Sequence, residues 1–151
     1  MDSHTQTAMN YFGQGYNCAQ SVFAAYSDRT KIGDSQSLKI ATAFGGGIAD
    51  TQKTCGAISG ALMVLGASLY NPDNPVISKD IVKQYSQTLI NLIEEKYSTS
   101  HCAELIKIDF SKDNPLEENQ QKEKDKICLQ VIEDVCIILD QMVKSQNAGL
   151  Q

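Results

Sequence analysis

Residues 43–70 read AFGGGIADTQKTCGAISGALMVLGASLY, and this stretch decides the fold. It opens with a triple glycine at 45–47, continues through a polar turn, and is apolar or small at nearly every position over 55–70. A surface helix would carry a polar face, so the helix predicted over 55–70 is buried and central. Gly56 and Gly60 predict close packing against a neighbouring helix, because glycine inside a helix costs about 1 kcal/mol relative to alanine.

Cys55 opens this apolar run and directly follows Thr54. Thr54 can cap the helix, because its hydroxyl can accept a hydrogen bond from a free backbone N–H of the first turn. Cys55 would then lie at the positive end of the helix dipole, which favours the thiolate. We therefore expect a depressed pKa for the Cys55 thiol. A buried cysteine with a purely structural role in a packed core is the alternative.

The chain has 151 residues, enough for one domain with its own core. Its net charge of -5 argues against a nucleic-acid partner, which normally requires a basic patch. The apolar run is shorter than the roughly 20 residues of a membrane-spanning helix, so no membrane span is expected. The first ten residues are polar and lack the apolar segment of a secretory signal, so a cytoplasmic location is expected.

Helical spacing of the apolar residues predicts an all-α fold, a single compact bundle of five to six helices around the Gly/Ala-rich central helix. The domain is expected to span residues 1–144, with a charged, solvated loop at about 109–124 and a disordered tail over 145–151. The Gly-rich segment lacks nucleotide-binding signatures, so no nucleotide is expected. Six predicted helices cover residues 4–13, 18–26, 35–44, 55–70, 78–97 and 122–143, and a short helical segment is predicted over 102–106.

Five cysteines are many for a chain without an export signal, and in a reducing compartment they indicate redox chemistry or metal binding. No Cys-x-x-Cys pair occurs in the sequence, so the fold must bring the cysteines together. Cys18, Cys55 and Cys102 each come at or just after a residue type that caps helices. Three helix N-termini aimed at one place would form an electropositive nest suited to thiolates or sulfide.

Two histidines are the other candidates for site chemistry. His101 stands beside Cys102 and could act as a base or a metal ligand, but a lone exposed histidine is more often neither. His4 is expected in a frayed chain end.

Three motifs at residues 17–20 (NCAQ), 44–47 (FGGG) and 55–60 (CGAISG) resemble those of the C-GCAxxG-C-C family of redox-active proteins. In that family a CGAxxG motif is accompanied by three further cysteines. Cys102 and Cys128 match the two later cysteines in order and in rough spacing. The resemblance covers residues from about 10 to 140.

The resemblance implies a site built from Cys18, Cys55, Cys102 and Cys128, with Cys136 outside the pattern. We expect Cys18, Cys55 and at least one of the two later cysteines to converge in the fold. More distantly, the chain resembles the cysteine-bearing part of split-Soret cytochromes, where an iron–sulfur cluster is expected. It has no Cys-x-x-Cys-His motif for covalent haem attachment.

Three functions stay open. The first is a thiol redox protein, which as an enzyme would be a thiol oxidoreductase. Cys55 and Cys18 would be the catalytic attacking thiols, and Cys102 and Cys128 would be resolving or structural partners. The second is a protein that binds an iron–sulfur cluster or zinc through the same four thiolates. The third is a non-catalytic helical interaction module. The expected partners are a redox partner protein and, because the central helix is so apolar, a second copy in a homodimer.

Overall fold

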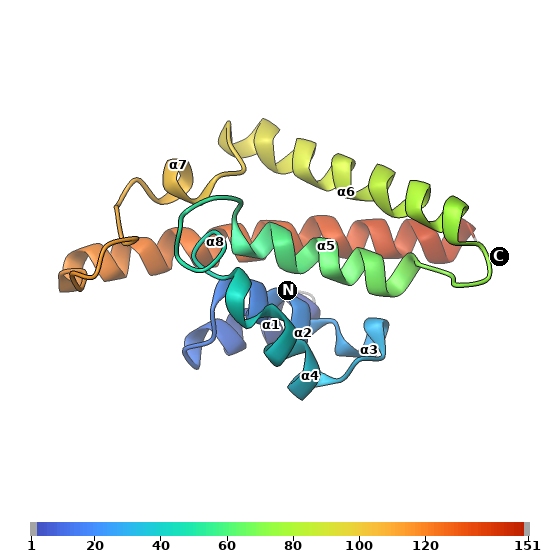
Figure 1. Ribbon diagram of the computed structural model, residues 1–151, viewed down its shortest axis with the longest axis horizontal. Helices are drawn as coiled ribbons and strands as arrows, with labels where there is room; N and C mark the ends of the chain where they lie inside the picture. The colour runs from blue at the N-terminus through green and yellow to red at the C-terminus, as the bar shows by residue number, and fades with distance from the viewer. Residues whose placement is uncertain (1–2, 150–151) are drawn as a thin grey trace.

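A computed structural model describes residues 3–149 of the chain, and its regular elements within that range are all helical (Figure 1). The prediction of an all-α fold is therefore confirmed. This range holds eight α-helices against the predicted five to six, and the four-residue α3 is the one that lies outside every predicted helical range. The elements are α1 (Ser3–Gly13), α2 (Cys18–Ala25), α3 (Ser27–Thr30), α4 (Asp34–Ala41), the 3-10 helix η1 (Thr42–Phe44), α5 (Gly56–Leu69), α6 (Pro75–Tyr97), α7 (Cys102–Ile106) and α8 (Glu118–Gly149).

Helix α5 lies at the centre of the bundle, as its composition predicted. Figure 1 shows α6 on one side of α5, the group α1 to α4 on the other, and α8 behind α5, and α5 packs against α2, α6 and α8. A Cβ atom built at Gly60 would lie 2.7 Å from the carbonyl oxygen of Ala19, and one at Gly56 would lie 3.0 Å from that of Phe44. Glycine at these positions therefore lets the backbones of α2, η1 and α5 approach closely.

Two predicted helix starts are wrong. The N-cap of α5 is Cys55 and not Thr54, because Thr54 pairs with His101 in an isolated antiparallel bridge. Helix α6 begins three residues before Ser78, at Pro75, whose fixed φ suits the first helical turn. The Ser78 hydroxyl instead accepts a hydrogen bond from the backbone N–H of Asn71 at 2.9 Å.

Helix α8 is longer at both ends than the helix predicted over 122–143. It begins at Glu118, so the irregular charged segment ends at residue 117. It continues through Gly149, and residues 150 and 151 of the expected tail lie outside the described residues. None of the helices within residues 3–149 combines the length and the apolar character that a membrane crossing needs.

Candidate functional site

Four of the five cysteines line one cavity of about 80 Å³. Cys18 is the first residue of α2, Cys55 is the N-cap of α5, and Cys102 is the first residue of α7. Cys128 does not lie at a helix start but well inside α8. The structure thus brings together cysteines from four separate elements.

The start of α2 is fixed by a complete capping box. The Asn17 side chain accepts a hydrogen bond from the backbone N–H of Gln20 at 2.9 Å, and the Gln20 side chain accepts one from the Asn17 N–H at 3.0 Å. The Asn17 amide also donates to the carbonyl oxygen of Thr42 at 2.9 Å. A Cβ at Gly45 would lie 2.3 Å from the Asn17 side chain. The NCAQ and FGGG motifs therefore pack directly on each other and hold Cys18 at the cavity.

The turn that follows the triple glycine is left-handed over almost its whole length. Non-glycine residues at positive φ are costly, and such strain persists where surrounding structure enforces it, often at functional sites. A Cβ at Gly47 would lie 2.7 Å from the Cβ of Cys102, so the turn presses closely against the cavity wall. The residues with positive φ in this turn are Gly46, Gly47, Ile48, Ala49, Asp50 and Gln52.

A short antiparallel pairing places Cys55 beside Cys102. The N–H of Cys55 donates to the carbonyl oxygen of Ser100 at 2.9 Å, and the N–H of Cys102 donates to that of Lys53 at 2.7 Å. These two bonds flank the bridge between Thr54 and His101. His101 itself faces solvent and does not line the cavity, so it contributes its backbone and not its ring to this arrangement.

The expected depression of the Cys55 pKa is wrong. Burial is the main cause that raises the pKa of this thiol from an ordinary 9.0 to about 12, and the charge of Cys18 adds to the effect. The backbone N–H groups of Ala57 and Ile58 act in the opposite direction, as expected at a helix start. Desolvation outweighs them, because Cys55 lies in the core and faces other thiols.

The two neighbouring thiols are also held in the protonated form. Burial first, and then the charges of Cys55 and Cys18, raise the pKa of Cys102 to about 12. A hydrogen bond to Cys128 is the largest cause that raises the pKa of Cys18 well above its ordinary value, followed by burial. Lys124 lowers the pKa of both Cys18 and Cys102. Cys18 is half-buried, whereas the other three cavity cysteines are buried.

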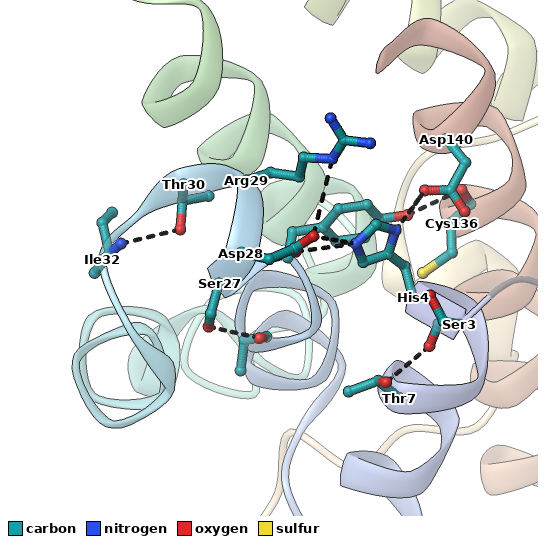
Figure 2. Close-up of polar contacts among 12 residues, drawn as sticks. Ser3, His4, Thr7, Ser27, Asp28, Arg29, Thr30, Ile32, Cys136 and Asp140 are labelled. Carbon is teal, nitrogen blue, oxygen red and sulfur yellow. Dashed lines mark hydrogen bonds and ion pairs between the residues drawn. The ribbon is translucent and has the colours of Figure 1, made fainter. Parts of the chain in front are cut away.

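Cys136 does not line the cavity. It lies beside a separate polar cluster (Figure 2). The Tyr26 hydroxyl donates to the Cys136 carbonyl oxygen at 3.1 Å and to Oδ1 of Asp140 at 2.9 Å. The two ring nitrogens of His4 contact Asp140 at 3.0 Å and Asp28 at 2.9 Å, and the ring stacks on Tyr26. His4 is therefore anchored between α3 and α8, and the expectation that it lies in a frayed end is wrong.

The cysteines carry no cross-link, and the residues around them do not form a ready metal site. No disulfide joins any of the five cysteines, all of which lie in the described part of the chain. Among residues 3–149, no group of three or more His, Cys, Asp or Glu side chains is arranged so that it could hold a metal ion. The cavity is thus a set of four neighbouring thiols.

Sequence reasoning missed three residues at this site, Gln52, Phe110 and Lys124. Phe110 and Lys124 line the cavity, and Gln52 binds the backbone on both sides of residue 109. Lys124 was expected in a solvated charged segment, and nothing in the local sequence separates it from the lysines around it. Only its approach to the cysteines in three dimensions reveals its role.

Comparison with known families gave a match. The sequence model of a family described as "Putative redox-active protein (C_GCAxxG_C_C)" matches residues 16–142, a range that contains all four cavity cysteines. Neither the search of curated proteins nor the search of solved structures gave a match.

Proposed function

The chain belongs to the C_GCAxxG_C_C family of redox-active proteins, and we propose that it is a thiol redox protein in which Cys18 and Cys128 are the reacting pair. The observation that carries this proposal is geometric: Cys18 and Cys128 line the same cavity, and Cys18 packs against the buried cluster that contains Cys128. Cys128 also has the largest effect on the pKa of the Cys18 thiol. Two thiols in contact can form a disulfide with little movement of the chain. Cys18 is the member that solvent can reach, so it is the attacking thiol, and the buried Cys128 is the resolving thiol.

The reaction is thiol–disulfide exchange with a disulfide of a redox partner protein. The Cys18 proton is released first, to solvent. The Cys18 thiolate attacks one sulfur of the partner disulfide, whose other sulfur leaves and takes up a proton. Cys128 then loses its proton and attacks the Cys18 sulfur, and the first partner sulfur leaves as a thiol. Two electrons have passed from this chain to the partner, which now carries two thiols.

The environment of the pair makes this exchange slow at neutral pH. Only the thiolate attacks, and the raised pKa of Cys18 keeps its thiolate fraction small. Lys124 opposes this by stabilising the thiolate. Cys55 and Cys102, with pKa values of about 12, stay protonated and serve as the polar wall of the cavity.

The second candidate is a protein that binds a metal centre through Cys18, Cys55, Cys102 and Cys128. Its support is the donor set itself, because four thiolates are the usual ligands of iron–sulfur clusters and of structural zinc. A bound cation would also reverse the pKa shifts, since a coordinating thiol loses its proton. A bound iron–sulfur cluster would supply one-electron transfer. Residues 3–149 contain no group arranged for a metal ion, so we rank this candidate second.

One preparation tests both candidates. The protein is purified without oxygen and analysed for metal and for visible absorption, and is then titrated against a glutathione redox buffer with the disulfides mapped by mass spectrometry. We expect a colourless, metal-free protein and a reversible Cys18–Cys128 disulfide. Cys18→Ser and Cys128→Ser should abolish that disulfide, and Cys136→Ser should leave it intact. Visible absorption with stoichiometric iron would favour the metal centre instead.

The proposal also has a cellular side. A cytoplasmic location fits a chain whose cysteines work as thiols, because that compartment keeps thiols reduced. The redox partner protein and the homodimer remain part of the proposal. Whether the chain turns over a substrate as a thiol oxidoreductase or passes electrons stoichiometrically is decided by assaying it with an excess of a disulfide substrate.

A further inference from the structure

A surface groove lies directly against the four-cysteine cavity. The groove has a volume of about 460 Å³ and runs between the α1–α2 turn and the first turns of α8. It shares three wall residues with the cavity, namely Phe12, Asn17 and Lys124. These side chains therefore form the partition between the groove and the thiols. All three are half-buried, as expected for a boundary between surface and interior.

Lys124 is held in this partition by Phe110. The Lys124 ammonium nitrogen lies 4.5 Å from the centre of the Phe110 ring, a cation–π contact. Phe110 also lines the cavity and packs against the cluster that contains Cys102 and Cys128. The Phe110 ring thus contacts both the wall of the four-cysteine cavity and Lys124.

Phe110 is in turn fixed by Gln52. The Gln52 side-chain amide donates to the carbonyl oxygen of Ile108 at 2.9 Å and accepts from the N–H of Phe110 at 3.1 Å. Gln52 is buried, and its own backbone is bonded to Gly46 and Ala103. Both the nitrogen and the oxygen of the Gln52 side-chain amide are hydrogen-bonded to the loop at residues 108–110. Because buried polar groups are costly to leave unpaired, these bonds hold the loop in one position.

We propose that Lys124 is the movable part of a gate between the groove and the cysteine cavity. Phe110 and its anchor Gln52 hold the gate closed. The groove is the entrance for a disulfide-bearing segment of the redox partner, because it shares Asn17 with the cavity, and the next residue along the chain is the half-buried Cys18 of the cavity wall. This proposal rests on the proposed thiol redox function. It adds the route by which a disulfide reaches Cys18 and a selection of reactants by size.

Size makes the gate necessary. The cavity of about 80 Å³ is well below the roughly 300–1,000 Å³ of ordinary ligand sites. A polypeptide disulfide does not fit in this space, whereas the adjoining groove lies in the usual range of ligand sites. Small reagents should therefore reach Cys18 far more easily than bulky ones until Lys124 moves aside.

The test compares two reagents with the same reactive group, N-ethylmaleimide and a maleimide coupled to polyethylene glycol. Labelling rates of each cysteine are measured by mass mapping on the reduced, metal-free full chain. The readout is the labelling rate of Cys18 by the bulky reagent divided by its labelling rate by the small reagent. Both reagents react with the same thiolate, so the effect of the thiol pKa cancels in this ratio. We expect Lys124→Ala and Gln52→Leu each to raise this ratio by about tenfold or more, since each removes contacts that hold the gate closed.

Two controls separate the gate from other effects. Lys124→Met keeps the length of the side chain, and its thioether can still pack against the Phe110 ring, but it carries no charge. Both rates should therefore fall while their ratio stays near that of the unmodified protein. Cys136, which is buried away from the cavity, should keep its labelling rate in every variant. An unchanged ratio in Lys124→Ala and Gln52→Leu, or equal acceleration at Cys18 and Cys136 in both, would overturn the proposal. The labelling experiment does not require a disulfide to form, so it tests the gate alone. The redox titration tests the Cys18–Cys128 exchange, and the two proposals can therefore fail separately.

Discussion

A Cβ atom at position 60 would lie 2.7 Å from the carbonyl oxygen of Ala19, so the pair Gly60 and Ala19 sets the distance between α5 and α2. Those two helices begin next to Cys55 and Cys18. The contact that packs the core therefore also sets the spacing of two cavity cysteines.

Gly60→Ala should destabilise the protein, because the new methyl group meets backbone that cannot move aside. We expect a loss of about 1–3 kcal/mol in the free energy of unfolding, measured by urea denaturation. Gly66→Ala is the matched control on the same helix, since a Cβ there has no neighbour within 4 Å. The control should gain about 0.5–1 kcal/mol from the better helix propensity of alanine. Equal effects of the two substitutions would contradict the close α2–α5 contact.

Gly47→Ala should disturb the cavity itself. The added methyl group would lie 2.7 Å from the Cβ of Cys102, at a φ of +70° that alanine adopts with strain. Gly15→Ala has a similar strain at a φ of +98°, but nothing lies within 4 Å of its Cβ. We expect Gly47→Ala to cost about 1–3 kcal/mol more than Gly15→Ala in urea denaturation. It should also change the labelling rate of Cys102, which Gly15→Ala should leave unaltered.

The buried thiols should make stability fall at alkaline pH. The pKa of Cys55 is raised to about 12 in the folded protein, so its folded state holds a proton that the unfolded state loses near the ordinary value of 9.0. This stabilisation is complete below about pH 9 and is lost as the pH rises toward about 12. Each such thiol contributes a slope of at most about 1.4 kcal/mol per pH unit.

The measurement is the free energy of unfolding in urea at about pH 8 and at about pH 10.5, inside this window. Cys55→Ala should show a smaller drop between the two values than the unmodified protein. Any packing defect of the variant is common to both pH values and cancels in the difference. A drop of the same size in both proteins would show that Cys55 does not hold its proton in the folded state.

The homodimer stays a prediction, and the start of α6 offers a way to test it. Val76 and Ile77 are 75% and 61% exposed, beside the half-exposed Tyr70. If this apolar surface forms the dimer contact, Val76→Asp should convert a dimer to a monomer in sedimentation at micromolar concentration. Ile40→Asp, at another exposed apolar position, should leave the dimer intact. A clean monomer for the unmodified protein would contradict the prediction.

The amino-acid sequence by itself determined the all-α class, most of the helices and the central place of α5. Apolar spacing reports which face of a helix is buried, and the small residues of α5 report how closely its neighbours approach. The cap at Asn17 was also predictable, because a capping box uses only residues within one turn. The group of four cysteines followed from the motif spacing and the resemblance to a known family.

Tertiary structure decided the chemistry of those cysteines. Thr54 lost its predicted capping role because residues far along the chain pair with its backbone. The pKa of Cys55 went up and not down because desolvation depends on everything packed around the sulfur, whereas the helix dipole is a local property. Cys18 of α2 lies near Cys128 of α8. Lys124 of α8 approaches both Cys18 and Cys102, so residues of α2, α7 and α8 meet across the bundle. Such contacts are set by how helices dock, which no local pattern encodes.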